Sequence, residues 1–209
     1  MPFDVSENLP DPLPESPWPI FRRWFDEAVA ARLVPNPNAF CLASCVDDRP
    51  SARIVLCRAI EDHAIVFFTN YESRKGQELL TTGRAAACFH FDHQDRQVRL
   101  EGTVEKVAPE QSDAYFNSRA IEKRIGAWAS AQSRPIESRD ALLAKVMETM
   151  TTLGVTLDED EVVPRPPHWG GLRLVTDAIE LWCSGEGRIH DRARWTRTTD
   201  TWSATRLQP

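Results

Sequence analysis

The chain has 209 residues, of which 42% are hydrophobic and 27% are charged, a balance typical of a globular protein. Its formal net charge of -6 argues against a duplex-binding protein, because such domains usually carry a basic surplus. No apolar run approaches the roughly 20 residues of a membrane-spanning helix, and the acidic, proline-rich start has no signal-peptide pattern. We therefore expect a cytoplasmic protein whose partners include neither nucleic acid nor a membrane.

Taken in chain order, the first 17 residues contain five prolines and several acidic residues, which predicts a mobile arm over residues 1–17. From Trp18 onward apolar residues recur at helical spacing, so we expect an amphipathic helix that ends before Pro35. The remaining residues, 18–209, are expected to form a single domain.

Short apolar segments separated by turn residues then predict strands over residues 39–46, 52–60, 65–69, 85–91, 97–107, 172–182, 192–196 and 201–207. Helices are expected at 73–81, 109–116 and 137–153, whereas 121–131 is helical or irregular and 158–168 is a surface loop. This order predicts a mainly β fold with helical additions, an α+β antiparallel barrel. A doubly wound parallel sheet is disfavoured, because strands and helices do not alternate regularly and no GxGxxG follows the first strand.

The five cysteines are odd in number and form no CxxC pair, so we expect reduced thiols rather than disulfides. His90 and His93 lie close together, yet the sequence contains no HExxH and no Cys/His cluster. A polar turn explains these histidines better, and no metal site is predicted.

Two segments combine cations with hydrogen-bond donors. After the strand at 65–69, hydroxyl groups, Arg74 and Lys75 meet the start of a helix that Ser73 is placed to cap. Positive charge at a helix N-terminus opposes the macrodipole, which favours a phosphate site over a solvated first turn. Arg53 and Arg58 flank an apolar strand on opposite faces, and taken alone this pattern favours two edge arginines that reach into water over a binding site.

Further polar groups suit a ligand or an ordinary surface. Gln97 shares a strand face with Arg99, and its amide suits either a heterocycle edge or an exposed cross-strand pair. Tyr115 precedes several cations, which could hold an anion or simply lie in water at the end of a helix. Small residues around a tryptophan at 126–133 allow either close backbone approach or a packing turn.

The segment from Trp182 to Arg192 has Arg188, His190 and Arg192 at two-residue spacing. If this segment is extended, all three side chains leave one face of a strand. Three nitrogen-rich groups on one face repel each other and are better placed beside an anionic or electron-rich ligand than in a core.

Taken together, these segments resemble the pyridoxamine 5′-phosphate oxidase family from about Trp24 to Pro209. The resemblance rests on RIVLCR, FFTNYESRKG, RQVRLEG, AYFNSR, RIGAWASAQS, HWGGLRL and the tail IELW…RIHDR with a terminal RLQP. It implies an FMN-binding split β-barrel, antiparallel and Greek-key-like, with a C-terminal dimerisation region. It also implies a homodimer that binds FMN at the subunit interface.

The resemblance assigns the site residue by residue. The implied FMN contacts are Arg53, Ile54, Val55, Leu56, Cys57, Arg58, Phe68, Thr69, Arg74, Lys75, Gln97, Gln132, Ser133, Trp182 and Arg192. The implied substrate contacts are Arg58, Tyr115, Arg119, Lys123, Arg188 and His190, and we expect Arg188 and His190 to place the reacting carbon. The family usually has lysine at the position of Arg58 and serine at that of Lys123.

The implied activity is FMN-dependent oxidation of pyridoxamine or pyridoxine 5′-phosphate to pyridoxal 5′-phosphate, with O2 as acceptor and H2O2 as product. Arg58 and Lys123 keep open a related flavin oxidase that acts on another ring compound, such as a phenazine precursor. A non-catalytic split barrel that binds FMN or pyridoxal phosphate, and more remotely one that handles haem, are the remaining alternatives.

Overall fold

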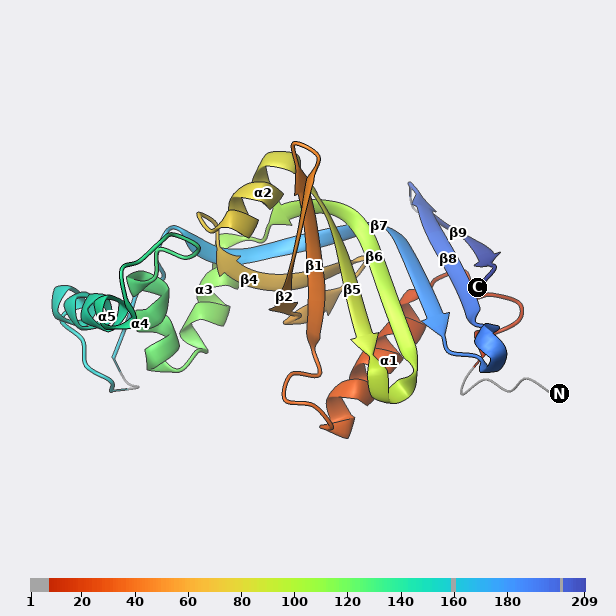
Figure 1. Ribbon diagram of the computed structural model, residues 1–209, viewed down its shortest axis with the longest axis horizontal. Coiled ribbons are helices and arrows are strands. Elements are labelled where there is room, and N and C mark those ends of the chain that lie inside the picture. The colour runs from red at the N-terminus through yellow and green to blue at the C-terminus, as the bar shows by residue number, and fades with distance from the viewer. Residues whose placement is uncertain (1–7, 159–160, 200) are drawn as a thin grey trace. The chain divides into compact units, whose positions relative to one another are not determined.

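The computed structural model describes residues 8–158, 161–199 and 201–209, and the chain divides into two compact units. The first unit comprises Met1–Phe67, Gly83–Val104 and Leu174–Pro209, and the second comprises Phe68–Thr82 and Glu105–Arg173. The chain passes between the units several times, so each unit is built from segments far apart in the sequence (Figure 1).

Nine strands and five α-helices form in the described residues. The strands are β1 (Ala39–Val46), β2 (Arg49–Leu56), β3 (Ala59–Glu61), β4 (Ala64–Asn70), β5 (Arg84–Phe91), β6 (Arg96–Lys106), β7 (Trp169–Cys183), β8 (Asp191–Thr198) and β9 (Thr201–Leu207). The helices are α1 (Trp18–Ala31), α2 (Arg74–Thr82), α3 (Pro109–Asn117), α4 (Ile121–Ala129) and α5 (Arg139–Leu153). The expected mainly β fold with helical additions is confirmed.

The first unit is organised by its sheet, whose strand order is β2-β1-β5-β6-β7-β4-β3, with β8 and β9 continuing from β7. The pairs β1–β2, β1–β5, β5–β6, β7–β8 and β8–β9 are all antiparallel. Helix α1 lies against this sheet and buries Phe21 and Trp24 (Figure 1). The Phe89 ring of β5 packs 5.2 Å from the Phe21 ring and 5.0 Å from the Phe40 ring, measured between centroids, so aromatic burial joins helix and sheet.

One expected strand is interrupted in the structure. The segment expected at 52–60 forms β2 and β3, which are separated at Cys57 and Arg58. Here the chain changes partners, because β2 pairs with β1 whereas β3 pairs with β4. The amide of Cys57 donates to the carbonyl of Asn38 and that of Arg58 to the carbonyl of Val66, so the break leaves neither amide unsatisfied.

The expected mobile arm lies partly outside the described residues, which begin at residue 8. Its described part contacts β8 and β9. The Leu9 amide donates to Asp191 Oδ2 at 2.7 Å, and Trp195 Nε1 donates to the Pro14 carbonyl at 2.9 Å. The Leu9 side chain is buried. Prolines remove backbone donors without preventing such contacts, because the carbonyls still accept hydrogen bonds.

The second unit packs α3, α4 and the start of β7 around Phe116, Ile121, Ile125, Val163 and Trp169. Residues 121–129 are helical. Helix α5 is capped by the Ser138 hydroxyl, which accepts from the Ala141 amide, and it ends at Gly154 in a left-handed conformation. The expected loop at 158–168 contains no helix or strand in its described part, although Val163 is buried in this core.

Candidate functional site

The N-terminal turn of α2 gathers polar side chains in the second unit. Ser73 caps the helix, because its Oγ accepts from the Gly76 amide at 3.2 Å. Lys75 Nζ donates to Thr69 Oγ1 at 3.0 Å and to Gln132 Oε1 at 2.8 Å. The structure therefore brings Thr69, Lys75 and Gln132 together from the end of β4, the start of α2 and the loop after α4.

The turn that carries this cluster has no room for a larger residue at position 76. A Cβ atom on Gly76 would lie 2.4 Å from the carbonyl oxygen of Tyr71 and 2.6 Å from that of Asn70. The Asn70 Nδ2 donates to the Ser130 carbonyl at 3.3 Å, and its Oδ1 accepts from the Glu72 amide. Asn70 thus ties the turn to the 130–133 loop. Our residue-by-residue assignment omitted it, although its place in the polar turn after a buried strand was a usable signal.

Arg74 and Ser133 are placed differently from Lys75. Arg74 pairs with Glu78 one helical turn along, at 2.8 Å, and 66% of its side chain is exposed. Ser133 is exposed and has a left-handed φ of 71°. Both residues lie on the segments that meet at Lys75.

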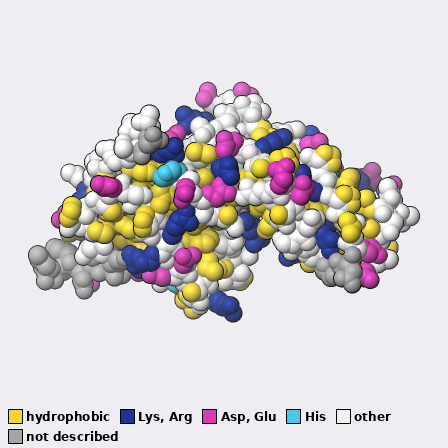
Figure 2. Space-filling model, turned by 180° about the vertical axis from the view of Figure 1, so that it is seen from behind, with side chains coloured by type: hydrophobic (Ala, Val, Ile, Leu, Met, Phe, Trp, Pro, Cys, Tyr) yellow, Lys and Arg dark blue, Asp and Glu magenta, His cyan; other side chains and the backbone are white. Residues whose placement is uncertain are grey.

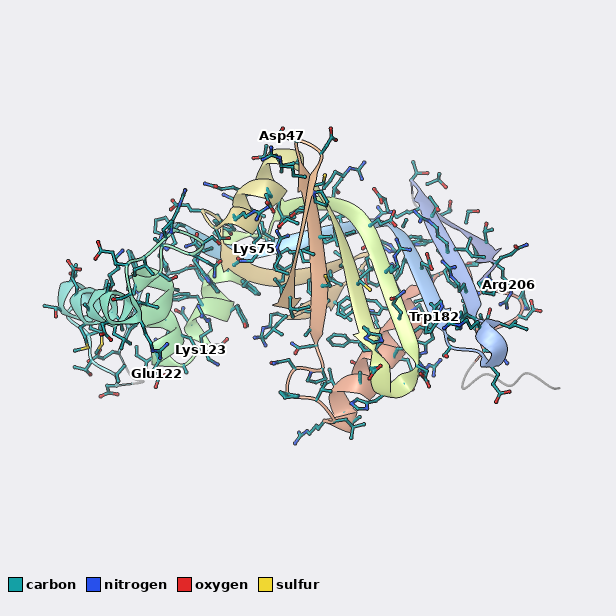
Figure 3. All side chains as sticks on the ribbon, viewed as in Figure 1. Asp47, Lys75, Glu122, Lys123, Trp182 and Arg206 are labelled. Atoms are coloured by element: carbon teal, nitrogen blue, oxygen red, sulfur yellow. The ribbon has the colours of Figure 1, made fainter. Side chains whose placement is uncertain are left out.

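A hollow of about 250 Å³ opens beside this cluster. Its lining combines Asn70 and Gln132 with two cations of the α3–α4 region, Arg119 and Lys123, and with Trp169. The Arg119 guanidinium carbon lies 4.6 Å from the Trp169 ring centroid, which holds the cation by a cation–π contact. Lys123 projects from α4 (Figure 3). Two cations that border one hollow suit an anionic ligand.

Tyr115 and Phe68 form the aromatic wall of the second unit. Their rings stack with centroids 3.9 Å apart at an interplanar angle of 21°, and Trp169 continues the stack, 5.6 Å from Phe68. The structure therefore brings these two predicted site residues together through ring stacking.

In the first unit, Arg53 is held on β2 by short contacts. Its Nη1 donates to Ser44 Oγ at 2.7 Å and its Nη2 to Ser51 Oγ at 2.6 Å. Arg58 is exposed beyond the end of β2, so these two arginines belong to different parts of the segment. Ile54 between them is 66% exposed.

Cys57 faces the opposite way, into the core of the first unit, with 2% exposure. Burial raises the pKa of its thiol to about 12, although hydrogen bonding to the Ala59 carbonyl opposes the shift. The thiol is therefore protonated at neutral pH. The Cys57 amide donates to the Asn38 carbonyl and its carbonyl accepts from Asn38 Nδ2, so the break after β2 is held by backbone contacts as well as by this buried side chain.

The segment through Arg188, His190 and Arg192 is not one extended strand, so the condition under which the three side chains would share a face is not met. Residues Glu186–Arg188 form a 3-10 turn in which Gly187 and Arg188 have left-handed φ values of 61° and 64°. The Gly185 amide donates to His190 Nδ1 at 3.1 Å and closes this turn. Arg192 alone of the three lies in β8, and Arg188 is exposed in the turn.

The structure nevertheless places His190 and Arg192 beside Trp182. The His190 and Trp182 rings lie 4.7 Å apart, and Trp182 is opposite Arg192 in the β7–β8 register. Figure 3 shows Trp182 on β7. Gln97 lies on β6, two residues from Arg99, and its side chain is half-buried.

Sequence reasoning missed Glu180, which is buried on β7. Its Oε1 accepts from Arg192 Nη2 at 2.8 Å and its Oε2 from Arg99 Nη1 at 3.2 Å. The cations near Trp182 therefore have an anionic neighbour within the same unit. An acidic residue two positions before Trp182, between the apolar residues Ile179 and Leu181, was the signal for it.

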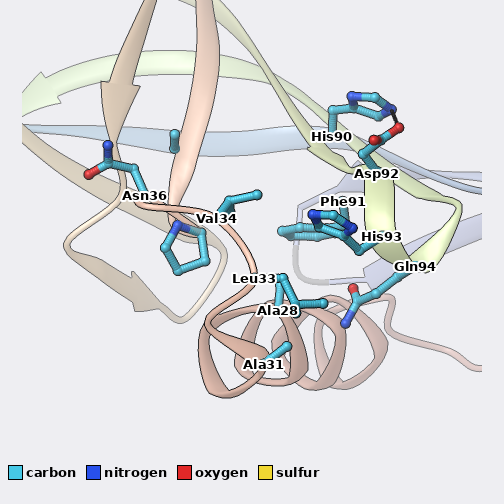
Figure 4. Close-up of a pocket in the computed structure, with 12 residues that line it drawn as sticks. Ala28, Ala31, Leu33, Val34, Asn36, His90, Phe91, Asp92, His93 and Gln94 are labelled. Carbon is cyan, nitrogen blue, oxygen red and sulfur yellow. Dashed lines mark ion pairs between the residues drawn. The ribbon is translucent and has the colours of Figure 1, made fainter.

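A larger hollow of about 360 Å³ in the first unit contains none of the predicted site residues (Figure 4). Its lining is mostly apolar and comes from the end of α1, the loop before β1 and the tip of the β5–β6 hairpin. His90 Nε2 lies 3.5 Å from Asp92 Oδ1 at its rim. Nothing in its lining resembles the cation and hydroxyl groups gathered at Lys75.

Two further properties concern the described residues as a whole. They contain no group of three His, Cys, Asp or Glu side chains arranged to hold a metal ion. They also contain no helix that is long and apolar enough to cross a membrane. On the face shown in Figure 2, acidic and basic side chains lie interspersed, with hydrophobic side chains between them.

Comparison with known proteins gives consistent matches. Residues 25–152 match the family model for pyridoxamine 5′-phosphate oxidase, and residues 169–209 match that for the pyridoxine 5′-phosphate oxidase C-terminal dimerisation region. The pyridoxine/pyridoxamine 5′-phosphate oxidase of Paraburkholderia phymatum is 49% identical over 209 residues, which cover 99% of this chain and 93% of that protein. The protein of the same name from Cupriavidus necator is 49% identical, with 98% and 92% covered.

Two solved structures are similar in fold. PhzG from Burkholderia lata, in complex with tetrahydrophenazine-1-carboxylic acid, has a TM-score of 0.83 and 33% identity, and 94% of each chain is covered. An FMN-binding protein related to pyridoxamine 5′-phosphate oxidase, from Nostoc punctiforme, has a TM-score of 0.71 and 16% identity, with 94% of this chain and 100% of that chain covered. At that identity the second likeness concerns the fold alone.

Proposed function

The chain belongs to the pyridoxamine 5′-phosphate oxidase family, and we propose that it oxidises pyridoxamine or pyridoxine 5′-phosphate to pyridoxal 5′-phosphate. It is an FMN-dependent oxidoreductase, and we assign O2 as the electron acceptor and H2O2 as the second product. The observation that carries the proposed substrate is the hollow bordered by Arg119 and Lys123 next to the Lys75 cluster. Two cations and several hydroxyl and amide groups match a small phosphorylated molecule.

The donor groups of the chain fit FMN. In the second unit, Lys75, with the Thr69 hydroxyl and the Gln132 amide around it, offers the charge and donors that a phosphate requires. In the first unit, Trp182, Arg192 and Gln97 offer an aromatic surface and N–H donors that suit a flavin ring and its polar edge. We assign the remaining FMN contacts to the family positions in Arg53–Arg58, Phe68, Arg74 and Ser133.

FMN, when bound, supplies the acceptor of two electrons from the substrate. For the amine substrate, C4′ loses two electrons and two protons to give an imine, and water hydrolyses this imine to the aldehyde and ammonia. For the alcohol substrate the same loss gives the aldehyde directly. O2 takes up the two electrons and two protons as H2O2, so the reaction is balanced.

The side chains of this chain bind and orient the substrate. We assign its phosphate to Arg58, Tyr115, Arg119 and Lys123, whose cations and phenol suit a dianion. His190 accepts from the Gly185 amide through Nδ1, so the neutral ring carries its proton on Nε2 and can donate from there. We place His190 and Arg188 at the reacting end of the substrate.

The match of residues 169–209 to a dimerisation region supports a homodimer. We propose that FMN binds at its subunit interface, so that each site takes residues from both copies. Size-exclusion chromatography with light scattering measures the oligomeric state directly. A monomer that retains FMN and full turnover would contradict the interface assignment.

An absorbance experiment tests the proposed function. Protein as purified should show flavin absorption bands, and anaerobic addition of pyridoxamine 5′-phosphate should bleach them. Oxygen uptake on re-aeration should then accompany pyridoxal 5′-phosphate formation. FMN-loaded protein that is bleached by neither phosphorylated vitamer would overturn the proposal.

A second candidate is favoured by the likeness to PhzG, at 33% identity over 94% of both chains. It is a flavin oxidase acting on a ring carboxylate of the phenazine type, and the Arg58 and Lys123 cations suit a carboxylate as well as a phosphate. Comparing kcat/KM for pyridoxine 5′-phosphate with that for a reduced phenazine carboxylate separates the two. Inhibition by pyridoxal 5′-phosphate competitive with substrate would argue against this candidate.

A further inference from the structure

Glu180 is a buried carboxylate in β7 to which the proposed function gives no role. Its side chain is 5% exposed, and it binds two arginines. Oε1 accepts from Arg192 Nη2 at 2.8 Å and from Arg192 Nε at 3.2 Å, while Oε2 accepts from Arg99 Nη1 at 3.2 Å. A carboxylate is buried at high cost unless it is paired, and these two cations compensate it.

The strand register places Glu180 on the same sheet face as the residues assigned to the flavin ring. Glu180 and Trp182 are two residues apart on β7, and Trp182 lies opposite Arg192 on β8, so the three side chains share a face. On β6, Gln97 and Arg99 are also two residues apart, and the Arg99 contact to Glu180 identifies their face as the same one. Glu180 therefore shares a sheet face with the residues assigned to the flavin ring.

The contacts of Arg192 determine which of its N–H donors remain available to a ligand. An arginine side chain carries five N–H donors on a planar group. Glu180 takes donors from Nε and Nη2, and the Gln208 carbonyl takes one from Nη1 at 3.1 Å. Among the described residues, this leaves one donor on each terminal nitrogen, and the two-point contact with Glu180 fixes the plane in which both lie.

We propose that Glu180 is a positioning residue for FMN: it holds the Arg192 guanidinium so that these two remaining donors meet the polar edge of the flavin ring. The proposal rests on the assignment of Arg192 to FMN made above. Arg99 pairs with the second oxygen of Glu180. The carboxylate charge is therefore shared between two arginines, and Arg192 keeps positive charge on the side that faces the ligand. Glu180 acts through Arg192 and does not itself contact the cofactor.

Glu101 provides a matched control on the same face. It accepts from Arg194 at 2.9 Å and lies 3.4 Å from Arg99, but it makes no contact with Arg192. The Glu180→Gln and Glu101→Gln variants therefore remove the same charge from one ion-pair network. The two variants differ in one respect: Glu180 contacts Arg192, whereas Glu101 does not.

The experiment is a double-mutant cycle on FMN affinity, measured by quenching of FMN fluorescence on titration of the full-length chain stripped of cofactor. Glu180→Gln should raise the Kd for FMN about tenfold, as expected for one displaced charge-assisted hydrogen bond. Glu101→Gln should change the Kd by no more than about twofold, because its pairs are half-exposed. In an Arg192→Ala background, Glu180→Gln should have no further effect, because the residue through which it acts is gone.

Two results would overturn the positioning role: an unchanged Kd in Glu180→Gln, or an equal rise in Kd with and without Arg192. Circular dichroism checks that each variant is folded, and Glu180→Asp, which keeps the charge but shortens the reach, replaces Glu180→Gln if that variant does not fold. The proposed function fails separately, when the wild-type chain binds no FMN or oxidises no substrate. Wild-type turnover together with an additive cycle would remove the Glu180 inference alone.

Discussion

Lys75 in the second unit and Arg192 in the first are both assigned to the cofactor, yet their surroundings differ in kind. Lys75 donates to the neutral oxygens of Thr69 and Gln132 at the start of a helix. Arg192 donates to the carboxylate of Glu180, which is buried and shared with Arg99. A lysine that donates to hydroxyl and amide oxygens at a helix N-terminus suits a phosphate, whereas the carboxylate uses part of the arginine's hydrogen-bonding capacity to fix its orientation. One cation is placed to bind an anion and the other to direct its donors.

The largest expected effect concerns stability in the first unit. Glu180→Ala leaves Arg99 and Arg192 without their buried carboxylate, and we expect it to lower the free energy of unfolding by about 2–3 kcal/mol, below the full buried-pair cost because both arginines are partly solvated. Glu101→Ala, whose pairs are half-exposed, should cost less than about 1 kcal/mol. Urea denaturation of both variants measures the contrast. Equal losses would show that burial of Glu180 contributes nothing beyond a surface pair.

In the second unit, Lys75→Met should weaken FMN binding about 100-fold while leaving thermal stability nearly unchanged, since one charge-assisted phosphate contact is lost. Arg74→Ala should have the smaller effect, because Arg74 pairs with Glu78 and is largely exposed. Fluorescence titration gives both Kd values. The reverse ranking would mean that Arg74, rather than Lys75, carries the phosphate contact.

The buried thiol of Cys57 predicts a pH dependence of stability. Its pKa is about 12 in the folded chain against an ordinary value of 9.0, so only the unfolded chain releases the proton between these pH values. Stability from this group is therefore fully present below pH 9 and falls as pH rises toward 12, by roughly 1.4 kcal/mol per pH unit at most.

Urea denaturation at several pH values checks this slope against a Cys57→Ala variant. That variant should be less stable at neutral pH and should lack this part of the decline above pH 9. The exposed Cys45 supplies a second control, because it should react with a thiol reagent in the folded protein while Cys57 does not. Rapid labelling of Cys57 in folded protein would contradict its burial.

The smallest expected effect concerns the substrate end. Lys123→Ser, which restores the residue usual in the family, should raise the KM for pyridoxine 5′-phosphate roughly threefold to tenfold and leave FMN affinity unchanged, because an exposed cation contributes modestly. The KM of the variant should also depend less on salt than that of the wild type. Glu122→Gln on the same helix is the control, and a KM unchanged by Lys123→Ser would remove Lys123 from the substrate site.

Much of the Lys75 region could be predicted from the sequence, because its signals are local. Ser73 stands where a helix cap is needed, and Thr69 and Lys75 flank it within a few residues. The approach of Gln132 could not be derived from spacing, since it depends on how the loop after α4 meets the end of β4. The 126–133 segment offered Gln132 as a polar contact, and the family resemblance assigned it to the site.

The region around Trp182 shows where local patterns mislead. Two-residue spacing would place Arg188, His190 and Arg192 on one face of an extended strand, but the positive φ values of Gly187 and Arg188 and the Gly185–His190 hydrogen bond form a turn instead. Alternation along a sequence cannot distinguish a strand from a tight turn of similar composition. The glycines at 185 and 187 were the available signal for the turn.

The sequence by itself determined the helices, most strands, the cap at Ser73 and the kinds of side chain available for an anionic, ring-shaped ligand. These properties depend on periodicity and on contacts between near neighbours in the chain. Only the tertiary structure decided which cations face neutral oxygens and which are held by a carboxylate. That choice depends on strand register: Glu180 meets Arg192 and Arg99 because β7 and its neighbouring strands align them on one face, and no local pattern encodes this alignment.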